Sequence, residues 1–136
     1  MKKLVYYWLP VILYLSLIFY LSSLSRIEVV ETLPTFILKD KLLHIIEYSI
    51  LAILLYRLLN QYEKLQPIAL ILAITLSTLY GLTDELHQLF VPGRFFSIQD
   101  LFADFIGSNI ILFQSRLIPR SLLRLIKQFS KVYFKN

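Results

Sequence analysis

Side chains that could bind a polar ligand or a metal ion gather in three stretches of an otherwise apolar sequence, at residues 44–48, 84–94 and 100–104. Ionisable groups inside a membrane segment are costly, so they normally face other protein or water and mark functional sites. Three such stretches together indicate one ligand-binding polar cluster. The predicted cluster consists of His44, Glu47, Tyr48, Asp84, Glu85, His87, Gln88, Arg94, Asp100 and Asp104.

Helical spacing indicates which of these side chains can face one another, because residues three or four apart lie on one face of a helix. Glu85 falls at the flank of its helical face and is expected to point elsewhere. Gly81, Gly107 and Ser108 would permit the faces to approach closely. The three faces expected to meet are His44/Glu47/Tyr48/Leu51, Tyr80/Gly81/Asp84/His87/Gln88 and Asp100/Asp104/Gly107/Ser108/Ile111.

Three uses of such a cluster compete on chemical grounds. A hydrogen-bonded bowl could bind a polar headgroup, with Arg94 receiving an anion and Asp100 suiting the positive end of its helix. The motifs His-x-x-Glu and Asp-x-x-His could instead bind Zn, Mn or Fe, although such pairs arise easily by chance. A purely structural network is the third use, at about 0.6 kcal/mol per hydrogen bond on average. No catalytic residue, metal or cofactor is assigned, and the candidate metal ligands are His44, Glu47, Asp84 and His87.

The elements that carry these residues are predicted from composition. The chain of 136 residues is 57% hydrophobic with a mean hydropathy of +0.67, whereas a soluble domain is about 45–50% apolar. Its apolar residues form blocks of about 20, the length of a membrane-spanning helix. We predict an all-α membrane protein with four transmembrane helices plus a C-terminal basic amphipathic interfacial helix. The predicted helices cover about 4–21, 41–59, 67–90 and 97–115, within a transmembrane domain of 1–116 that precedes a cytoplasmic tail of 117–136.

Local signals refine the ends of these helices. The sequence at 23–25 would also suit cleavage of a signal peptide, but the apolar run before it is longer than a usual signal-peptide core, which favours an uncleaved span. Pro67 suits the first turn of a helix, and residues 91–94 predict a tight turn. Ser97 is a plausible N-cap, with Asp100 completing a capping-box-like start.

Two segments are predicted to lie on the membrane surface, a short helix around 33–38 and the tail. Basic residues recur every three or four positions through the tail, opposite a regular apolar face, as in interfacial amphipathic helices. The tail carries most of the net charge of +5, so membrane lipid rather than nucleic acid is the expected partner. The absence of cysteine excludes disulfides, thiolate metal sites and a cysteine nucleophile.

The distribution of basic residues predicts the orientation in the membrane, because positive charges tend to stay in the cytoplasm. With four spans, the side that holds both termini carries ten Lys and Arg residues and the other side carries four. Both termini are therefore expected to be cytoplasmic. The polar cluster, which lies at the other ends of the helices, is expected to face outward.

The whole polar cluster falls in three segments, DKLLHIIEY (40–48), YGLTDELHQLFVPGR (80–94) and DLFADFIG (100–107). These segments resemble the VanZ-like family of small bacterial integral membrane proteins, over about residues 10–113. The middle motif is specific, since chance rarely produces DE-x-HQ-x-x-x-PGR downstream of HxxEY. The name-giving member of that family is associated with resistance to teicoplanin, so the resemblance implies a place and a broad process rather than a reaction.

From the cluster and the resemblance we expect a multi-pass protein of the bacterial cytoplasmic membrane that binds a cell-envelope component. The expected ligand is a lipid-linked wall precursor or an amphiphilic glycopeptide antibiotic, with a contribution to teicoplanin-type resistance. The alternative is a metal-dependent intramembrane hydrolase acting on a lipid headgroup or pyrophosphate. A small transporter is a third option, which would need an oligomer because four spans leave little room for alternating access. The oligomeric state is left open.

Overall fold

The computed structural model describes residues 2–24 and 37–113, and the predictions for residues 33–36 and for the tail at 117–136 lie outside this part of the chain. The described residues are helical and contain no β-strand. The described part of the chain forms four helices: α1 (Lys2–Ser22), α3 (Ile37–Leu59), α4 (Ala69–Gln88) and α5 (Ile98–Asn109).

Three of these helices are long and apolar enough to cross a membrane. The qualifying segments are Val5–Ser22, Asp40–Leu59 and Ala69–Gln88. Each has the roughly 18–20 residues that a helix needs to cross a hydrocarbon core about 30 Å thick. Helix α5 has 12 residues and is about 18 Å long at 1.5 Å per residue. The structure thus supports an all-helical protein with three candidate spans, and the fourth span stays a prediction.

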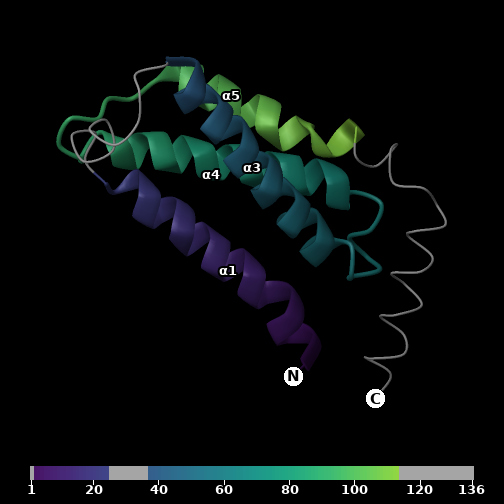
Figure 1. Ribbon diagram of the computed structural model, residues 1–136. Helices are drawn as coiled ribbons and strands as arrows, with labels where there is room; N and C mark the ends of the chain where they lie inside the picture. The colour runs from purple at the N-terminus through teal and green to yellow at the C-terminus, as the bar shows by residue number, and fades with distance from the viewer. Residues whose placement is uncertain (1, 25–36, 114–136) are drawn as a thin grey trace.

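Consecutive helices run in alternating directions, so polar ends that are distant in sequence come together. Figure 1 shows the last turn of α1, the first turn of α3, the last turn of α4 and the first turn of α5 at one end of the molecule. Helices α3, α4 and α5 all pack against one another, and α1 lies against α3 and, less extensively, α4. We call the shared end the cluster end, because the predicted polar residues lie there.

Small residues allow the three central helices to approach closely. The buried face of α4 repeats every fourth position, through Ala69, Ala73, Ser77 and Gly81, as is common at helix contacts in membranes. On α5, a Cβ added at Gly107 would lie only 2.4 Å from the carbonyl oxygen of Ile45. The backbones of α5 and α3 are therefore in direct contact, as expected for Gly107 from its place on the predicted face.

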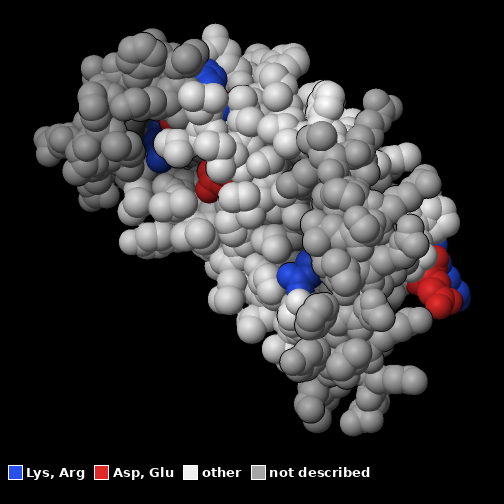
Figure 2. Space-filling view, turned by 45° about the vertical axis from the view of Figure 1, so that its right-hand side comes forward, with Lys and Arg blue, Asp and Glu red and all other residues white. Residues whose placement is uncertain are grey.

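Apolar side chains lie both inside and outside this bundle. The apolar core is formed by α1, α3 and α4, with Val11, Ile18, Leu51 and Leu55 among its buried members. Large apolar side chains are also exposed along each of the four helices. The face drawn in Figure 2 is mostly uncharged over the described atoms, with few Lys, Arg, Asp and Glu. Such a surface is suited to lipid contact rather than to water.

The connection between α4 and α5 follows the predicted turn chemistry. The Arg94 N–H donates to the Val91 carbonyl at 3.1 Å, and Gly93 has a φ of 78°, a conformation that glycine adopts readily. Ser97 is the N-cap of α5 and its hydroxyl accepts the Asp100 N–H at 3.2 Å. The prediction for Pro67 was wrong by two residues, because α4 begins at Ala69.

The opposite end of the molecule carries aromatic and basic side chains. The Trp8 indole donates to the Tyr62 hydroxyl at 3.1 Å, and the Arg57 guanidinium lies 4.2 Å from the centre of the Tyr6 ring. Trp and Tyr are enriched at membrane–water interfaces, where their polar atoms reach water. These contacts join the start of α1 to the end of α3 and the following loop, far from the cluster end.

Candidate functional site

Most of the buried polar residues at the cluster end come from α3, α4 and α5 and lie between these three helices. Buried side chains here include His44 and Tyr48 from α3, Asp84 and Glu85 from α4, and Asp104 from α5. Charged groups are rarely buried unless they are paired or bind a ligand. Their burial follows from the close packing at Gly81 and Gly107, which brings α3, α4 and α5 together around them.

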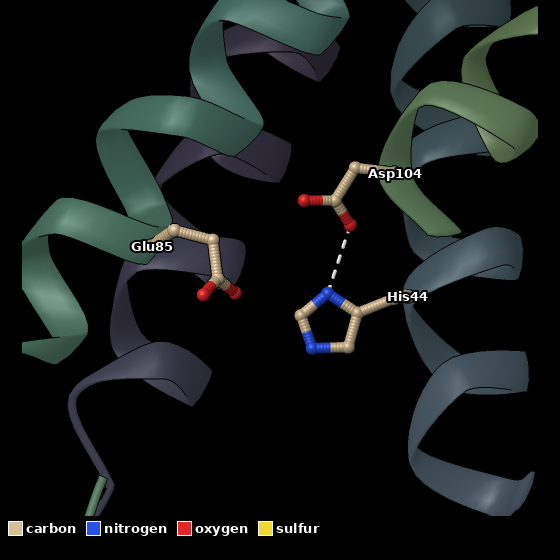
Figure 3. Close-up of side chains that lie close together, drawn as sticks. All are labelled: His44, Glu85 and Asp104. Atoms are coloured by element: carbon tan, nitrogen blue, oxygen red, sulfur yellow. Dashed lines mark hydrogen bonds and ion pairs between the residues drawn. The ribbon is translucent and has the colours of Figure 1, made fainter. Parts of the chain in front are cut away.

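His44, Glu85 and Asp104 form the centre of the site. The Nδ1 atom of His44 lies 2.8 Å from Oδ1 of Asp104, and both residues are buried. One ligand atom from each of the three residues lies within 4.8 Å of the other two. In Figure 3 the Glu85 carboxylate extends from α4 toward His44 and Asp104 on the opposing helices. We refer to these three residues as the central triad.

Two oxygens of the central triad lack a partner. Oε1 of Glu85 and Oδ2 of Asp104 are buried and accept no hydrogen bond from any described residue. The second Glu85 oxygen, Oε2, accepts the backbone N–H of Ser97 at 2.7 Å. An unsatisfied buried carboxylate oxygen is destabilising, so these atoms mark the place where a cation, a proton or a ligand donor would be stabilised.

An ion pair between Lys41 and Asp100 lies beside the triad, at the start of α5. Burial favours a raised pKa for Asp100, but the hydrogen bonds with Lys41 and Ser97 outweigh it and hold the pKa below its ordinary value. The Asp100 carboxylate is thus stabilised in its charged form by neighbours on two elements. Lys41 was not among the predicted site residues, although its position three residues before His44 could have indicated it.

Further polar side chains of α3 and α4 lie beside the central triad. The Gln88 side-chain amide donates to Asp84 Oδ2 at 3.1 Å, and both residues are buried. Glu47 is half-buried and interacts electrostatically with His44, Asp84 and Arg94. Tyr48 is fully buried, and its hydroxyl has no hydrogen-bond partner in the described part of the chain. These groups connect the central triad to the interior of the bundle.

His87 and Arg94 point to α1 rather than into the centre. His87 Nε2 lies 3.0 Å from the Ser23 hydroxyl, and its ring centre is 4.6 Å from that of Phe19. Arg94 donates from Nε to the Leu24 carbonyl at 3.2 Å. The prediction that His87 shares the inner face was wrong, because α1 packs on that side of α4 and supplies its partners.

Glu85 corrects the prediction in the opposite sense. Helical spacing predicted Glu85 at the flank of its face, yet Glu85 is 0% exposed and faces α3 and α5. The reason is the four-residue spacing of Ser77, Gly81 and Glu85, which continues the stripe of small residues on α4. That stripe was the signal in the sequence that could have placed Glu85 inside.

A serine layer below the triad was also missed. Ser108 Oγ on α5 donates to Ser77 Oγ on α4 at 2.8 Å, and Ser77 Oγ donates to the Tyr48 carbonyl of α3 at 3.2 Å. Both serines are fully buried. These bonds join the three helices at one depth and contribute about 0.6 kcal/mol each on average for membrane proteins. These hydrogen bonds fix how α3, α4 and α5 are rotated relative to one another, and so help to orient the central triad.

The fold and site define a class: helical membrane proteins in which acidic and histidine side chains from three helices are buried together at one end. The sequence profile of the VanZ/LLP1 family matches residues 7–118 of the chain. The chain therefore belongs to this family, as its motifs indicated. Searches against curated individual proteins and against solved structures found no match.

Proposed function

We propose that this VanZ/LLP1-family protein binds the polar headgroup of an amphiphilic cell-envelope component in the polar cluster. The observation that carries the proposal is the burial of acidic groups from α3, α4 and α5 at one end of a bundle with an apolar outer surface. A headgroup placed there would reach the acids while its apolar part stays in lipid. Lipid-linked wall precursors and amphiphilic glycopeptides both combine a polar headgroup with an apolar part. Family membership supports a role in glycopeptide resistance.

The acids also indicate which groups of the ligand are recognised. Asp84 and Glu47 are acceptors when ionised, so they favour hydroxyl and amino groups, which donate hydrogen bonds. Sugar hydroxyls and ammonium groups meet this requirement. Leu86 and Phe90 lie among the cluster residues in the sequence and are exposed. They would supply apolar contacts for the ligand's tail.

Ligand capture tests this proposal. The wild-type protein, purified from bacterial membranes in mild detergent, is expected to carry an envelope amphiphile that mass spectrometry identifies. Asp84→Asn should lower the amount recovered by about tenfold, because a hydrogen bond to a charged group contributes about 1.5 kcal/mol or more. Glu63→Gln, at an exposed position on the opposite end of the bundle, is the matched control and should recover the wild-type amount.

Equal recovery of the same amphiphile from wild type and Asp84→Asn would refute the assignment of the site. The same measurement separates binding from the alternative of hydrolysis, because a hydrolase would release a headgroup or phosphate from the bound molecule. An intact molecule after prolonged incubation with purified protein supports binding. Accumulation of the cleaved product would replace the binding role with the hydrolytic one.

A further inference from the structure

We propose that His44, Glu85 and Asp104 form a binding site for one first-row divalent cation. The three side chains come from three different helices and supply an imidazole nitrogen and two carboxylate oxygens. This ligand set is suited to Zn²⁺, Mn²⁺ and Fe²⁺, whereas Mg²⁺ and Ca²⁺ favour sites built from oxygen alone. The site differs from the set His44, Glu47, Asp84 and His87 considered from the sequence.

The unpartnered oxygens are the independent observation that points to a cation. Glu85 and Asp104 are both 0% exposed, and each has one oxygen without a hydrogen-bond donor among the described residues. Figure 3 shows both carboxylates directed into the space that His44 also faces. Neutralising two buried carboxylates removes most of the desolvation penalty that otherwise opposes this arrangement.

The basic side chains nearby are engaged in other contacts. Lys41 pairs with Asp100, and Arg94 donates to the carbonyl of Leu24. His44, the basic group in contact with Asp104, carries at most one positive charge against two carboxylates. A divalent cation supplies the missing charge and the missing contacts together.

The three candidate ligand atoms lie somewhat farther apart than the ligands of a bound metal ion do. The ligand atoms lie within 4.8 Å of one another, whereas ligands of a tetrahedral ion with bonds near 2.0 Å are about 3.3 Å apart. Small rotations of the Glu85 and Asp104 side chains would close this difference. Three protein ligands leave at least one coordination position open, as in zinc sites that also bind water or substrate.

Zn²⁺ alone is sufficient to test the site. Full-length protein in detergent, freed of metal with a chelator, is titrated with Zn²⁺ against a fluorescent competitor. Wild type should bind about one Zn²⁺ per chain. His44→Gln and Glu85→Gln should each weaken binding by about 100-fold or more, since even substitutions outside the first shell commonly cost 10–100-fold.

Matched controls change a residue of the same type that lies outside the proposed site. The chain has two histidines, so His87→Gln, which alters the histidine that contacts Ser23, should bind Zn²⁺ as wild type does. Glu63→Gln in the exposed loop should do the same. No Zn²⁺ uptake by wild type, or equal losses from His44→Gln and His87→Gln, would overturn the proposal.

A second measurement covers the case in which the triad variants do not fold. Mn²⁺ bound to wild type should show coupling to one imidazole nitrogen in pulsed EPR, and the coupling should persist in His87→Gln. Bound Mn²⁺ without nitrogen coupling excludes His44 as a ligand and overturns the proposed site. The cation site can be tested apart from the envelope ligand. If metal-free protein still retains the amphiphile, the proposed headgroup binding stands, whatever the Zn²⁺ titration shows.

Discussion

At the scale of single residues, the contacts of each acid decide its role more than its position in a motif does. Asp100 is paired with Lys41, Asp84 accepts from Gln88, and Glu85 is left with one free oxygen. Among the acids that the structure describes, only Glu85 and Asp104 are fully buried and have an oxygen that accepts no hydrogen bond. This difference marks Glu85 and Asp104 as the candidate cation ligands among these acids.

The ion pair of Lys41 and Asp100 predicts a pH-dependent stability. Lys41→Met leaves Asp100 buried without its partner and should lower the free energy of unfolding by about 1–3 kcal/mol at neutral pH. The pKa of Asp100 is lowered in the folded protein, so the pair stabilises fully above the unfolded pKa of about 3.9. Its contribution is lost as the pH falls from there through the folded pKa.

Thermal unfolding in detergent at several pH values measures this effect. The difference in Tm between wild type and Lys41→Met should be constant from about pH 7 to pH 5 and should shrink below about pH 4. A difference that persists unchanged at pH 3 would contradict the assignment of the ion pair as the stabilising contact.

At the scale of elements, glycines set the distance between the helices that carry the site. Gly107 brings the backbone of α5 onto that of α3, and Gly81 leaves room for the Asp104 carboxylate. The two glycines therefore have different neighbours: rigid backbone in one case and a side chain in the other. Close approach of α3, α4 and α5 is the condition for the triad to meet at all.

Alanine at these two positions should have unequal effects. Gly107→Ala places a methyl group against the carbonyl of Ile45 and forces the helices apart, so we expect a loss of about 1–3 kcal/mol, as for overpacked cores. Gly81→Ala meets Oδ2 and Cβ of Asp104. The carboxylate can rotate away, and Cβ needs to shift by only a few tenths of an ångström, so this change should cost less. Thermal unfolding of both variants in one detergent measures the difference. Equal or reversed losses of stability would show that the α3–α5 backbone contact is not the more sensitive of the two contacts.

At the scale of the whole molecule, the alternating helices place aromatic and basic groups at one end and the buried acids at the other. Trp8, Tyr62 and Arg57 lie at the first end. The central triad lies at the second end, where α3 and α5 begin and α4 ends. This polarity matches a protein that presents two different surfaces to the two sides of a membrane. The basic residues predict that the acidic end faces outward.

Cysteine labelling tests that orientation, because the chain has no cysteine of its own. Phe95→Cys lies in the exposed connection at the cluster end, and Lys64→Cys lies in the exposed loop at the other end. An impermeant maleimide added to intact cells should label Phe95→Cys, and it should label Lys64→Cys only after the cells are permeabilised. The reverse pattern would place the cluster in the cytoplasm and remove its access to an outer ligand.

The sequence by itself determined the all-helical class with long apolar helices, the family and the tight turn. These features depend on local properties: apolar run length, the conformations open to Pro92 and Gly93, and the spacing of residues along one helix. The stripe of small residues on α4, which includes Ser77 and Gly81, is also present in the sequence. Extending it by four residues places Glu85 on the inner face.

Only the tertiary structure decided which side chains meet across helices. Helical periodicity gives the direction in which a residue projects from the helix axis. It does not say which neighbouring helix packs on that side. His87 faces α1, whereas Glu85 faces α3 and α5, because α1 packs against a different side of α4 from α3 and α5. The partner of His44 is therefore Asp104, 60 positions away, a contact that no local pattern in the sequence could specify.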